Sequence, residues 1–160
     1  MPKFYNVAFR PQAEKEFGAR QLTEVMKRAV AGARRQLQQT PVQFHHAFPH
    51  IAEHFHEDTM DKPVHGVFFT KYHQPGALTA LLLRAMNGPG TAPQLSKSDD
   101  GDWAVLIQTW FGAGHGIGYK TIGKAKVELA FLCVLVRLNG DLVTAFPSDR
   151  YLGPGNKLPT

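Results

Sequence analysis

Only one cysteine is present among the 160 residues, so no disulfide can form within the chain. Secreted mini-domains that depend on disulfides use several cysteines, and this chain is outside that class. Cys133 stands within the apolar run 129–136, where a small buried thiol is the ordinary expectation. No cationic residue adjoins it in sequence to favour the thiolate. We therefore expect Cys133 to be structural rather than nucleophilic.

The chain also lacks long apolar segments, and no run approaches the roughly 20 apolar residues that a membrane helix needs. Residues 1–6 contain no apolar core of a signal peptide. These absences predict no membrane partner. They predict a cytoplasmic location, in the cytosol of the producing, host or target cell.

Acidic residues are scarcer than basic ones, with 13 Asp and Glu against 18 Lys and Arg. The formal net charge is +5, and the isoelectric point is near 9.5. A positive surface raises the local concentration of phosphates, so this balance favours a polyanionic partner or substrate.

The length and the 43% apolar content suit a single domain, 1–160. Apolar residues recur three and four apart from about Pro11 to Gln39, which predicts an amphipathic helix. Its other face carries cations, which form either a solvated helix face or a binding surface. These are Lys15, Arg20, Lys27, Arg28, Arg34 and Arg35. Shorter helices are predicted from Pro49 to about Asp58 and from Pro75 to Asn87.

The strands are predicted mainly in the second part of the chain. The patterns indicate strands at 64–72, 103–111 and 126–138 and a loop at 88–101. The fold class is therefore α+β, with N-terminal helices packed on one face of a roughly four-stranded antiparallel sheet. Residues 1–100 are the mainly helical part, and 101–150 are the sheet that carries the site.

A hairpin is predicted at Asn139-Gly140, the dipeptide that favours a two-residue type I′ turn. The register that follows pairs Leu138 with Asp141, Arg137 with Leu142, Val136 with Val143 and Leu135 with Thr144. Alternation then places Arg137 and Thr144 on one face of the sheet. The opposite face is apolar and is expected to take the helices. It comprises Val134, Val136, Leu138, Val143 and Ala145.

The segment 111–124 is a glycine-rich connection between two predicted strands and carries His115, Tyr119, Lys120 and Lys124. Glycines allow the backbone to approach a ligand closely. Histidine can move protons near neutral pH, and lysine can stabilise charge on phosphorus. A phosphate-binding P-loop is excluded, because the required Gly-Lys-Ser/Thr does not occur here. The alternative is a hairpin loop whose His115 only faces water.

The tail of the sequence resembles the barnase, EndoU, colicin and RelE group of bacterial toxin ribonucleases. The resemblance rests on Gly114-His115-Gly116 after a strand, then a long apolar strand, then a hairpin into Leu142-Val143-Thr144-Ala145-Phe146-Pro147. It covers about residues 100–150. It implies helices ahead of an antiparallel sheet, with His115 as the general acid or base and Thr144 as the hydroxyl on a strand.

Further residues complete the candidate site by their chemical type. Lys120 and Arg137 would contact phosphate, so the catalytic candidates are His115, Thr144, Lys120 and Arg137. Tyr119, Lys124 and Ser148 are candidate substrate contacts.

The middle of the chain is rich in histidine, which the resemblance does not require. Residues 45–65 contain His45, His46, His50, His54, His56 and His65 together with Glu53, Glu57 and Asp58. The four-residue spacing of His50 and His54 can bring two imidazoles to one helix face, as in some zinc or nickel sites. However, no Glu follows the first of them, as a zinc-protease helix requires. The segment is either a surface cluster of unliganded histidines, a metal site or a pH-sensitive surface.

The sequence thus predicts a metal-independent endoribonuclease of the toxin or effector type, without a cofactor. It would cleave RNA, tRNA among the candidates, by transesterification to a 2′,3′-cyclic phosphate. A toxin of this kind implies a cognate inhibitor or immunity protein. Two alternatives stay open. One is a non-catalytic basic protein, such as a phage or accessory factor, that binds a protein or nucleic acid. The other is a metal-dependent enzyme that uses the histidines of 45–65.

Overall fold

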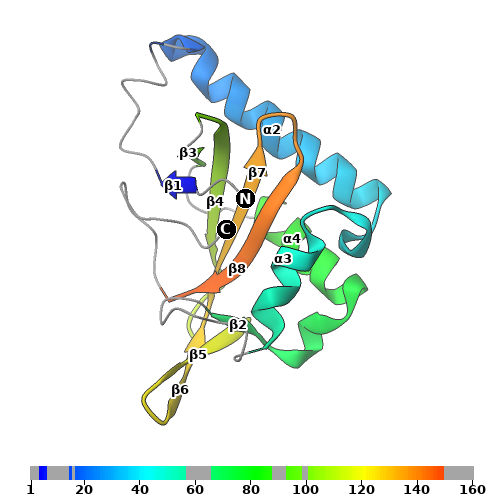
Figure 1. Cartoon of the computed structure of the whole chain (residues 1–160), viewed down its shortest axis with the longest axis vertical. Helices are drawn as coiled ribbons and strands as arrows, with labels where there is room; N and C mark the ends of the chain where they lie inside the picture. The colour runs from blue at the N-terminus through cyan, green and yellow to red at the C-terminus, as the bar shows by residue number, and fades with distance from the viewer. Residues whose placement is uncertain are drawn as a thin grey trace.

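The computed structural model describes residues 4–6, 15, 17–56, 66–87, 93–98 and 101–149 (Figure 1). The helical elements are α2 (Ala19–Gln39), the 3₁₀ turn η1 (Val42–Phe44), α3 (Phe48–Ala52), the 3₁₀ turns η2 (Glu53–Phe55) and η4 (Thr70–His73), and α4 (Pro75–Asn87). The strands are β1 (Phe4–Asn6), β2 (Val67–Phe68), β3 (Gln94–Ser98), β4 (Trp103–Trp110), β5 (Gly118–Ile122), β6 (Ala125–Leu129), β7 (Phe131–Arg137) and β8 (Leu142–Ser148).

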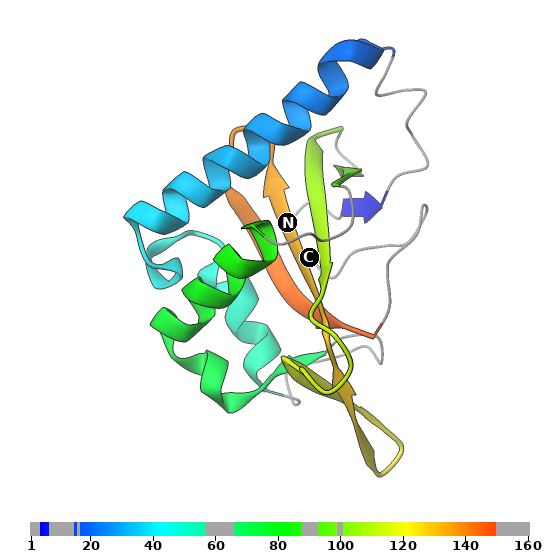
Figure 2. The same cartoon turned by 180° about the vertical axis from the view of Figure 1, so that it is seen from behind.

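Helices cover one face of the main antiparallel sheet, which confirms the predicted α+β class. The sheet has the strand order β1-β3-β4-β7-β8, and a smaller sheet has the order β2-β5-β6. Figure 2 shows α2 and α4 in front of the main sheet. Their apolar residues share a core with alternate residues of β4, β7 and β8. The main sheet has five strands rather than about four, because β1 and β3 join it from the first 100 residues.

Helix α2 begins later than the periodicity predicts. Lys15 and Phe17 are helical, but Gly18 has φ +79° and separates them from the helix that begins at Ala19. Residues 11–14 and 16 lie outside the described part. The C-terminal end agrees with the prediction, because Thr40 precedes proline and is extended. The predicted basic face is exposed at Lys15, Arg20, Lys27, Arg28 and Arg35, and partly exposed at Arg34.

The middle of the chain is less regular than expected. Helix α3 tightens into η2 after Ala52, and residues 57–65 lie outside the described part. The strand predicted at 64–72 is wrong beyond β2. After Val67 and Phe68 pair with β5, the chain turns into η4 to enter α4 at Pro75. Helix α4 runs to Asn87 as predicted.

The predicted loop 88–101 contains strand β3, so that prediction is wrong. The segment Gln94–Ser98 offers little sequence signal for a strand, since its side chains are mostly polar. Pairing with β4 on one side and β1 on the other fixes it in the sheet. Long-range pairing has here overridden local propensity.

The predicted strand 126–138 is two strands that belong to different sheets. β6 pairs with β5, whereas β7 lies between β4 and β8. The chain changes sheet at Ala130, whose carbonyl accepts from the Phe111 amide at 2.8 Å. Segment 125–128 is exposed, whereas 132–136 is fully buried, as expected for the segment that contains Cys133.

The hairpin between β7 and β8 forms, but its turn is not type I′. Only Gly140 has positive φ, at +94°, while Asn139 does not. The Gly140 amide donates to the Arg137 carbonyl at 2.9 Å, and the Arg137 amide donates to the Asp141 carbonyl at 2.8 Å. These bonds define a three-residue loop, 138–140, that ends in a left-handed glycine. The Asn139 side chain accepts from the Asp141 amide at 3.0 Å and supports the turn.

The extra loop residue shifts the register by one, and a β-bulge restores it. Val136 pairs with Leu142 rather than with Val143, but Leu135 pairs with Thr144 as predicted. Val143 therefore packs with Leu135 on the face turned away from α2 and α4, which we call the distal face. Leu142 takes its place in the helix-side core.

Arg137 and Thr144 share the distal face, in agreement with the prediction. Arg137 pairs with Ala104 and Thr144 pairs with Leu135. Both partners belong to the distal apolar cluster.

Candidate functional site

The residues proposed for catalysis from sequence are spread over both sheets. Arg137 ends β7 opposite Ala104, whereas Phe131 begins β7 opposite Trp110. His115 lies in the connection that follows Trp110, at the Phe131 end. Successive strand residues advance by about 3.3 Å, so the two ends of β7 are about 20 Å apart. His115 and Arg137 are therefore not brought into one site.

His115 is exposed, and its backbone amide donates to the Gly112 carbonyl at 3.1 Å. Lys120 is mostly buried and makes an ion pair with Asp149. Tyr119 stacks on Phe69, with ring centroids 6.2 Å apart.

Lys124 lies at the turn between β5 and β6, and Ser148 is buried at the end of β8. Ser148 also hydrogen-bonds the Cys133 thiol, which lowers the pKa of Cys133, but desolvation dominates and raises that pKa to about 12. The thiol is thus held protonated and buried, as the sequence predicts for a structural cysteine.

Thr144 is buried, and its hydroxyl has no hydrogen-bond partner among the residues that the structure describes. The same is true of the Ser96 hydroxyl on β3. Buried polar atoms in native proteins are usually paired, so an orphan hydroxyl is a place to look for a ligand or water. Ser96 pairs with Ala104, so both hydroxyls belong to the distal face.

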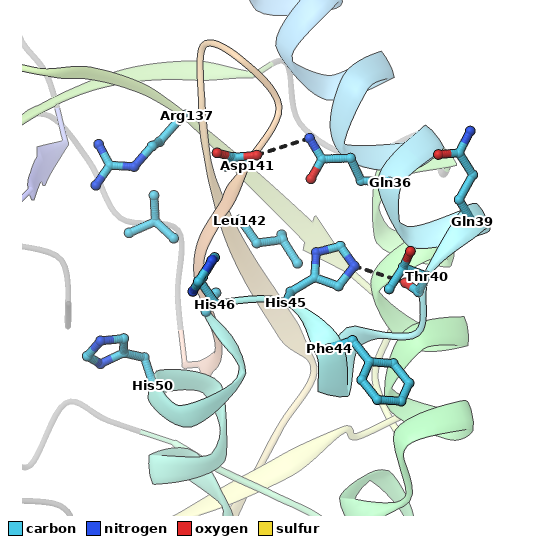
Figure 3. Close-up of a pocket in the computed structure, with 12 residues that line it drawn as sticks. Gln36, Gln39, Thr40, Phe44, His45, His46, His50, Arg137, Asp141 and Leu142 are labelled. Carbon is cyan, nitrogen blue, oxygen red and sulfur yellow. Dashed lines mark hydrogen bonds between the residues drawn. The ribbon is translucent and has the colours of Figure 1, made fainter.

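A cleft of about 590 Å³ lies where η1 and α3 pack against the β7–β8 hairpin (Figure 3). Its lining comprises Gln36, Gln39, Thr40, Phe44, His45, His46, Ala47, His50, Arg137, Asp141, Leu142 and Val143. Three imidazoles and one guanidinium thus meet in one concave surface. Of the residues predicted for the site, the cleft contains Arg137.

The imidazoles occupy different parts of the cleft. Figure 3 shows His46 and His50 on the same side of β8 as the Arg137 guanidinium, and His45 on the other side near the end of α2. His46 is exposed, and His50 is partly exposed with its Nδ1 3.8 Å from Glu53 Oε1.

His45 is oriented by the backbone. Its Nε2 donates to the Thr40 carbonyl at 2.9 Å. Because a carbonyl only accepts, Nε2 carries the proton and Nδ1 is the acceptor of the neutral ring.

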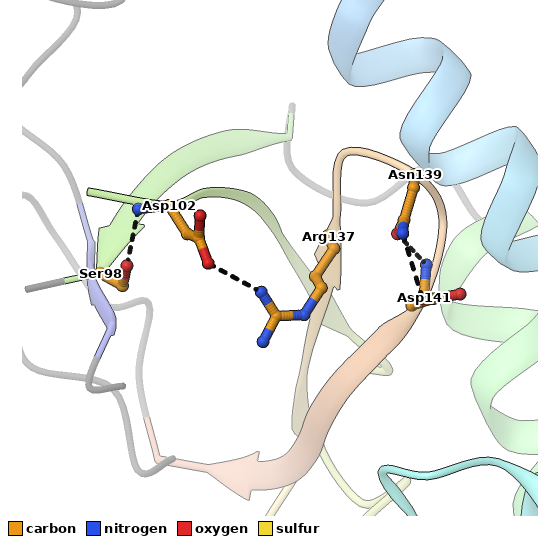
Figure 4. Close-up of polar contacts among 5 residues, drawn as sticks. All are labelled: Ser98, Asp102, Arg137, Asn139 and Asp141. Atoms are coloured by element: carbon orange, nitrogen blue, oxygen red, sulfur yellow. Dashed lines mark hydrogen bonds and ion pairs between the residues drawn. The ribbon is translucent and has the colours of Figure 1, made fainter. Parts of the chain in front are cut away.

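Arg137 is held by an ion pair between β7 and the start of β4 (Figure 4). Its Nη1 donates to Asp102 Oδ2 at 3.2 Å, from β7 to the start of β4. Asp141 accepts from Asn139 Nδ2 and from Gln36 Nε2, both at 3.1 Å. These bonds link the hairpin to α2 and fix the rim of the cleft on which Arg137 lies.

The cleft also has an aromatic edge. Phe44 is 69% exposed, although η1 anchors its neighbour Val42 in the core. An exposed ring beside hydrogen-bonding groups such as Gln39 and Thr40 can stack on a nucleobase while those groups contact its polar edge.

The described residues contain no group of three or more His, Cys, Asp or Glu that could hold a metal ion. The predicted pairing of His50 with His54 on one helix face is wrong, because α3 ends between them and His54 has non-helical φ and ψ. His54 is buried, donates from Nδ1 to the Gly66 carbonyl at 3.1 Å, and stacks on Phe146. Glu57, Asp58 and His65 lie outside the described part.

Sequence reasoning noted the histidines and Arg137 separately but did not join them. The cleft histidines precede Arg137 by 87 to 92 residues, and no spacing rule connects η1 with a β-hairpin. The proline-bounded break between α2 and α3, at Thr40-Pro41, was the available signal that the histidine segment turns back over the sheet.

No helix in the described ranges has the length and apolar character needed to cross a membrane. Comparison of the chain with protein-family models, with curated proteins and with solved structures gave no match.

Proposed function

We propose that the protein is a metal-independent endoribonuclease whose active site is the histidine cleft. The observation that carries the proposal is the meeting of His45, His46 and His50 with Arg137 in one cleft. RNA cleavage by transesterification needs a base, an acid and a cation, and these side chains supply all three.

In the proposed mechanism, one of His46 and His50 takes the proton of the ribose 2′-hydroxyl. The 2′-oxygen attacks the adjacent phosphorus, and Arg137 stabilises the negative charge of the phosphorane. The other imidazole, in its protonated form, gives a proton to the 5′-oxygen as the P–O bond breaks. The products are a 2′,3′-cyclic phosphate and a free 5′-hydroxyl, and no metal or cofactor takes part.

Two further features support RNA as the substrate. The net charge of +5 favours a polyanion, and residues 100–150 resemble toxin ribonucleases in the strand that carries Thr144. Thr144 follows Val143, which lines the cleft, so its orphan hydroxyl is a candidate contact for the scissile phosphate. A cytosolic toxin with this activity would need an inhibitor protein in the cell that makes it.

The test is cleavage of total cellular RNA in EDTA by the wild type, His46→Ala and His50→Ala. Losing a positioned acid or base typically costs about 10² to 10⁴ in rate. We expect a loss of this size in each of the two variants. His56→Ala, an exposed imidazole outside the cleft, serves as the control and is expected to retain activity.

Absence of cleavage by the folded wild type, or full activity of both cleft variants, would overturn the proposal. Binding of RNA without turnover would instead favour a non-catalytic basic binding protein. Activity that EDTA abolishes would favour a metal-dependent enzyme.

A further inference from the structure

The hairpin of β5 and β6 projects from the end of the molecule opposite the turn between β7 and β8 (Figures 1 and 2). Its register pairs Gly118 with Leu129 at the base and Ile122 with Ala125 at the tip. β2 pairs with it only at the base, through Tyr119 and Gly118. The turn Gly123-Lys124 has positive φ only at Gly123, +63°, as in a II′ hairpin.

One face of this hairpin is apolar and exposed. Lys120 pairs with Val127, and Ile122 pairs with Ala125, so these side chains share a face. Ile122 is 56% exposed and Val127 is 40% exposed. A two-stranded hairpin is marginal on its own in water, and the exposed side chains of Ile122 and Val127 are available for contact with a partner.

The charge of the hairpin identifies the kind of partner. Lys124 and Lys126 are exposed near the tip, and Lys126 lies 4.6 Å from the centre of the Tyr119 ring. The acid of this hairpin, Glu128, accepts from the Gly116 amide at 3.1 Å near the base. Lys126 pairs with Thr121, so it lies on the face opposite to Ile122 and Val127. A ribbon with lysines at its tip and on one face, and apolar side chains on the other, suits a nucleic acid, whose phosphates and sugars offer both kinds of contact.

We infer that the β5–β6 hairpin is a substrate arm that holds RNA away from the cleft. Lys124 and Lys126 contact phosphates, and Ile122 and Val127 contact the sugars and bases. The inference rests on the proposed function and adds the size class of its substrate.

The distance between arm and cleft sets that size. β6 and β7 follow one another from Ala125 to Arg137, so the tip lies at most about 40 Å from Arg137 at roughly 3.3 Å per residue. An RNA strand that spans this full distance has about 12 stacked nucleotides at roughly 3.4 Å each, whereas a stacked hexanucleotide spans only about 20 Å. The arm therefore favours a long substrate, such as a transfer RNA, over a hexanucleotide.

The test compares a double variant, which combines Lys124→Glu and Lys126→Glu, with the wild type. Two substrates are used, a transfer-RNA pool and an RNA hexanucleotide. We expect KM for the transfer-RNA pool to rise about tenfold, because phosphate contacts are lost. The salt slope of binding should also fall, by about 0.7 for each lost contact. Cleavage of the hexanucleotide should not change. The control variant, Lys27→Glu with Arg28→Glu on α2, makes the same charge change at exposed positions and should have a smaller effect.

Circular dichroism checks that the double variant is folded. The single variant Lys124→Gln keeps the contact of Lys126 with Tyr119, so its effect on KM reports the lost charge without a change in that contact. Equal effects of the two charge reversals, or an unchanged KM, would overturn the inference. If the wild type cleaves neither RNA, affinity for the transfer-RNA pool, measured by fluorescence anisotropy, tests the arm independently. Weaker binding of the hairpin variant than of the α2 variant then supports the arm, and equal binding overturns it.

Discussion

Single side chains of the distal face differ in how their polar groups are satisfied. The Arg137 guanidinium pairs with Asp102, and Thr109 on the helix side donates to the Ala85 carbonyl at 2.9 Å. Thr144 and Ser96 have no such partner among the described residues. A buried hydroxyl without a partner lowers the stability of the free protein by about 1–3 kcal/mol. Such a hydroxyl is therefore expected where a bound ligand supplies the missing hydrogen bond.

Replacement of Thr144 separates stability from activity. Thr144→Val keeps the shape of the side chain and removes the orphan hydroxyl, so we expect a melting temperature that is unchanged or about 2–4 °C higher. We expect RNA cleavage to fall if this hydroxyl contacts the substrate, as its position directly after the cleft residue Val143 suggests. Thermal unfolding and initial rates on the same preparations measure both effects.

Ser96→Ala is the matched control, since it removes the other orphan hydroxyl from a strand separated from β8 by β4 and β7. It should leave cleavage intact. A melting temperature several degrees lower in Thr144→Val would mean that the hydroxyl makes a hydrogen bond in the folded protein. A cleavage rate of Thr144→Val equal to that of the wild type would remove Thr144 from the site.

At the level of elements, the sequence predicts what depends on local periodicity and turn chemistry. The ends of α4 and the C-terminal end of α2 follow from proline and apolar spacing. By contrast, β3 is polar and is fixed by its two neighbours, and the break at Ala130 follows from pairing in two sheets. Gly18 interrupts a periodic helix pattern, and periodicity alone does not reveal such a break.

The β7–β8 turn is held against α2 by a contact between two glycines. A Cβ on Gly140 would lie 2.9 Å from the carbonyl carbon of Gly32 and 3.0 Å from the Ala33 amide nitrogen, and φ at Gly140 is +94°. Gly140→Ala therefore meets both backbone strain and helix backbone that cannot yield. We expect a loss of at least about 2 kcal/mol in the free energy of unfolding, measured by urea denaturation.

Gly101→Ala isolates the strain, because Gly101 has φ +96° but nothing within 4 Å of an added Cβ. The difference between the two variants measures the contact with α2. Equal losses would show that the hairpin does not press on the helix. Because Arg137 lies at this hairpin, Gly140→Ala should also impair cleavage more than Gly101→Ala.

For the whole molecule, the sequence predicted the layers but not the site. The face shared by Arg137 and Thr144 follows from strand alternation and is confirmed. The place of His115 was inferred from a short motif, and the path of the chain after β4 takes it to the other end of the sheet. Where η1 and α3 meet the hairpin depends on packing between segments about ninety residues apart, which no local pattern encodes.

The two ends of β7 therefore offer rival locations for catalysis, and one pair of variants decides between them. We expect Arg137→Ala to lower kcat/KM on RNA by about 10² or more, because a cation that stabilises the phosphorane is removed. We expect His115→Ala to change it less than about twofold, because His115 lies about 20 Å away along the sheet. The ion pair of Arg137 with Asp102 is partly exposed, so its loss should cost only about 0–1 kcal/mol and leave the fold intact. Circular dichroism checks that folding.

Double variants test the same choice. Because Arg137 and His46 line the same cleft, the double variant of these two should raise the activation free energy by less than the sum of the two single variants. The effects of His115→Ala and Arg137→Ala on the activation free energy should instead be additive. The reverse pattern, with cleavage lost in His115→Ala and kept in Arg137→Ala, would move the active site to the connection between β4 and β5.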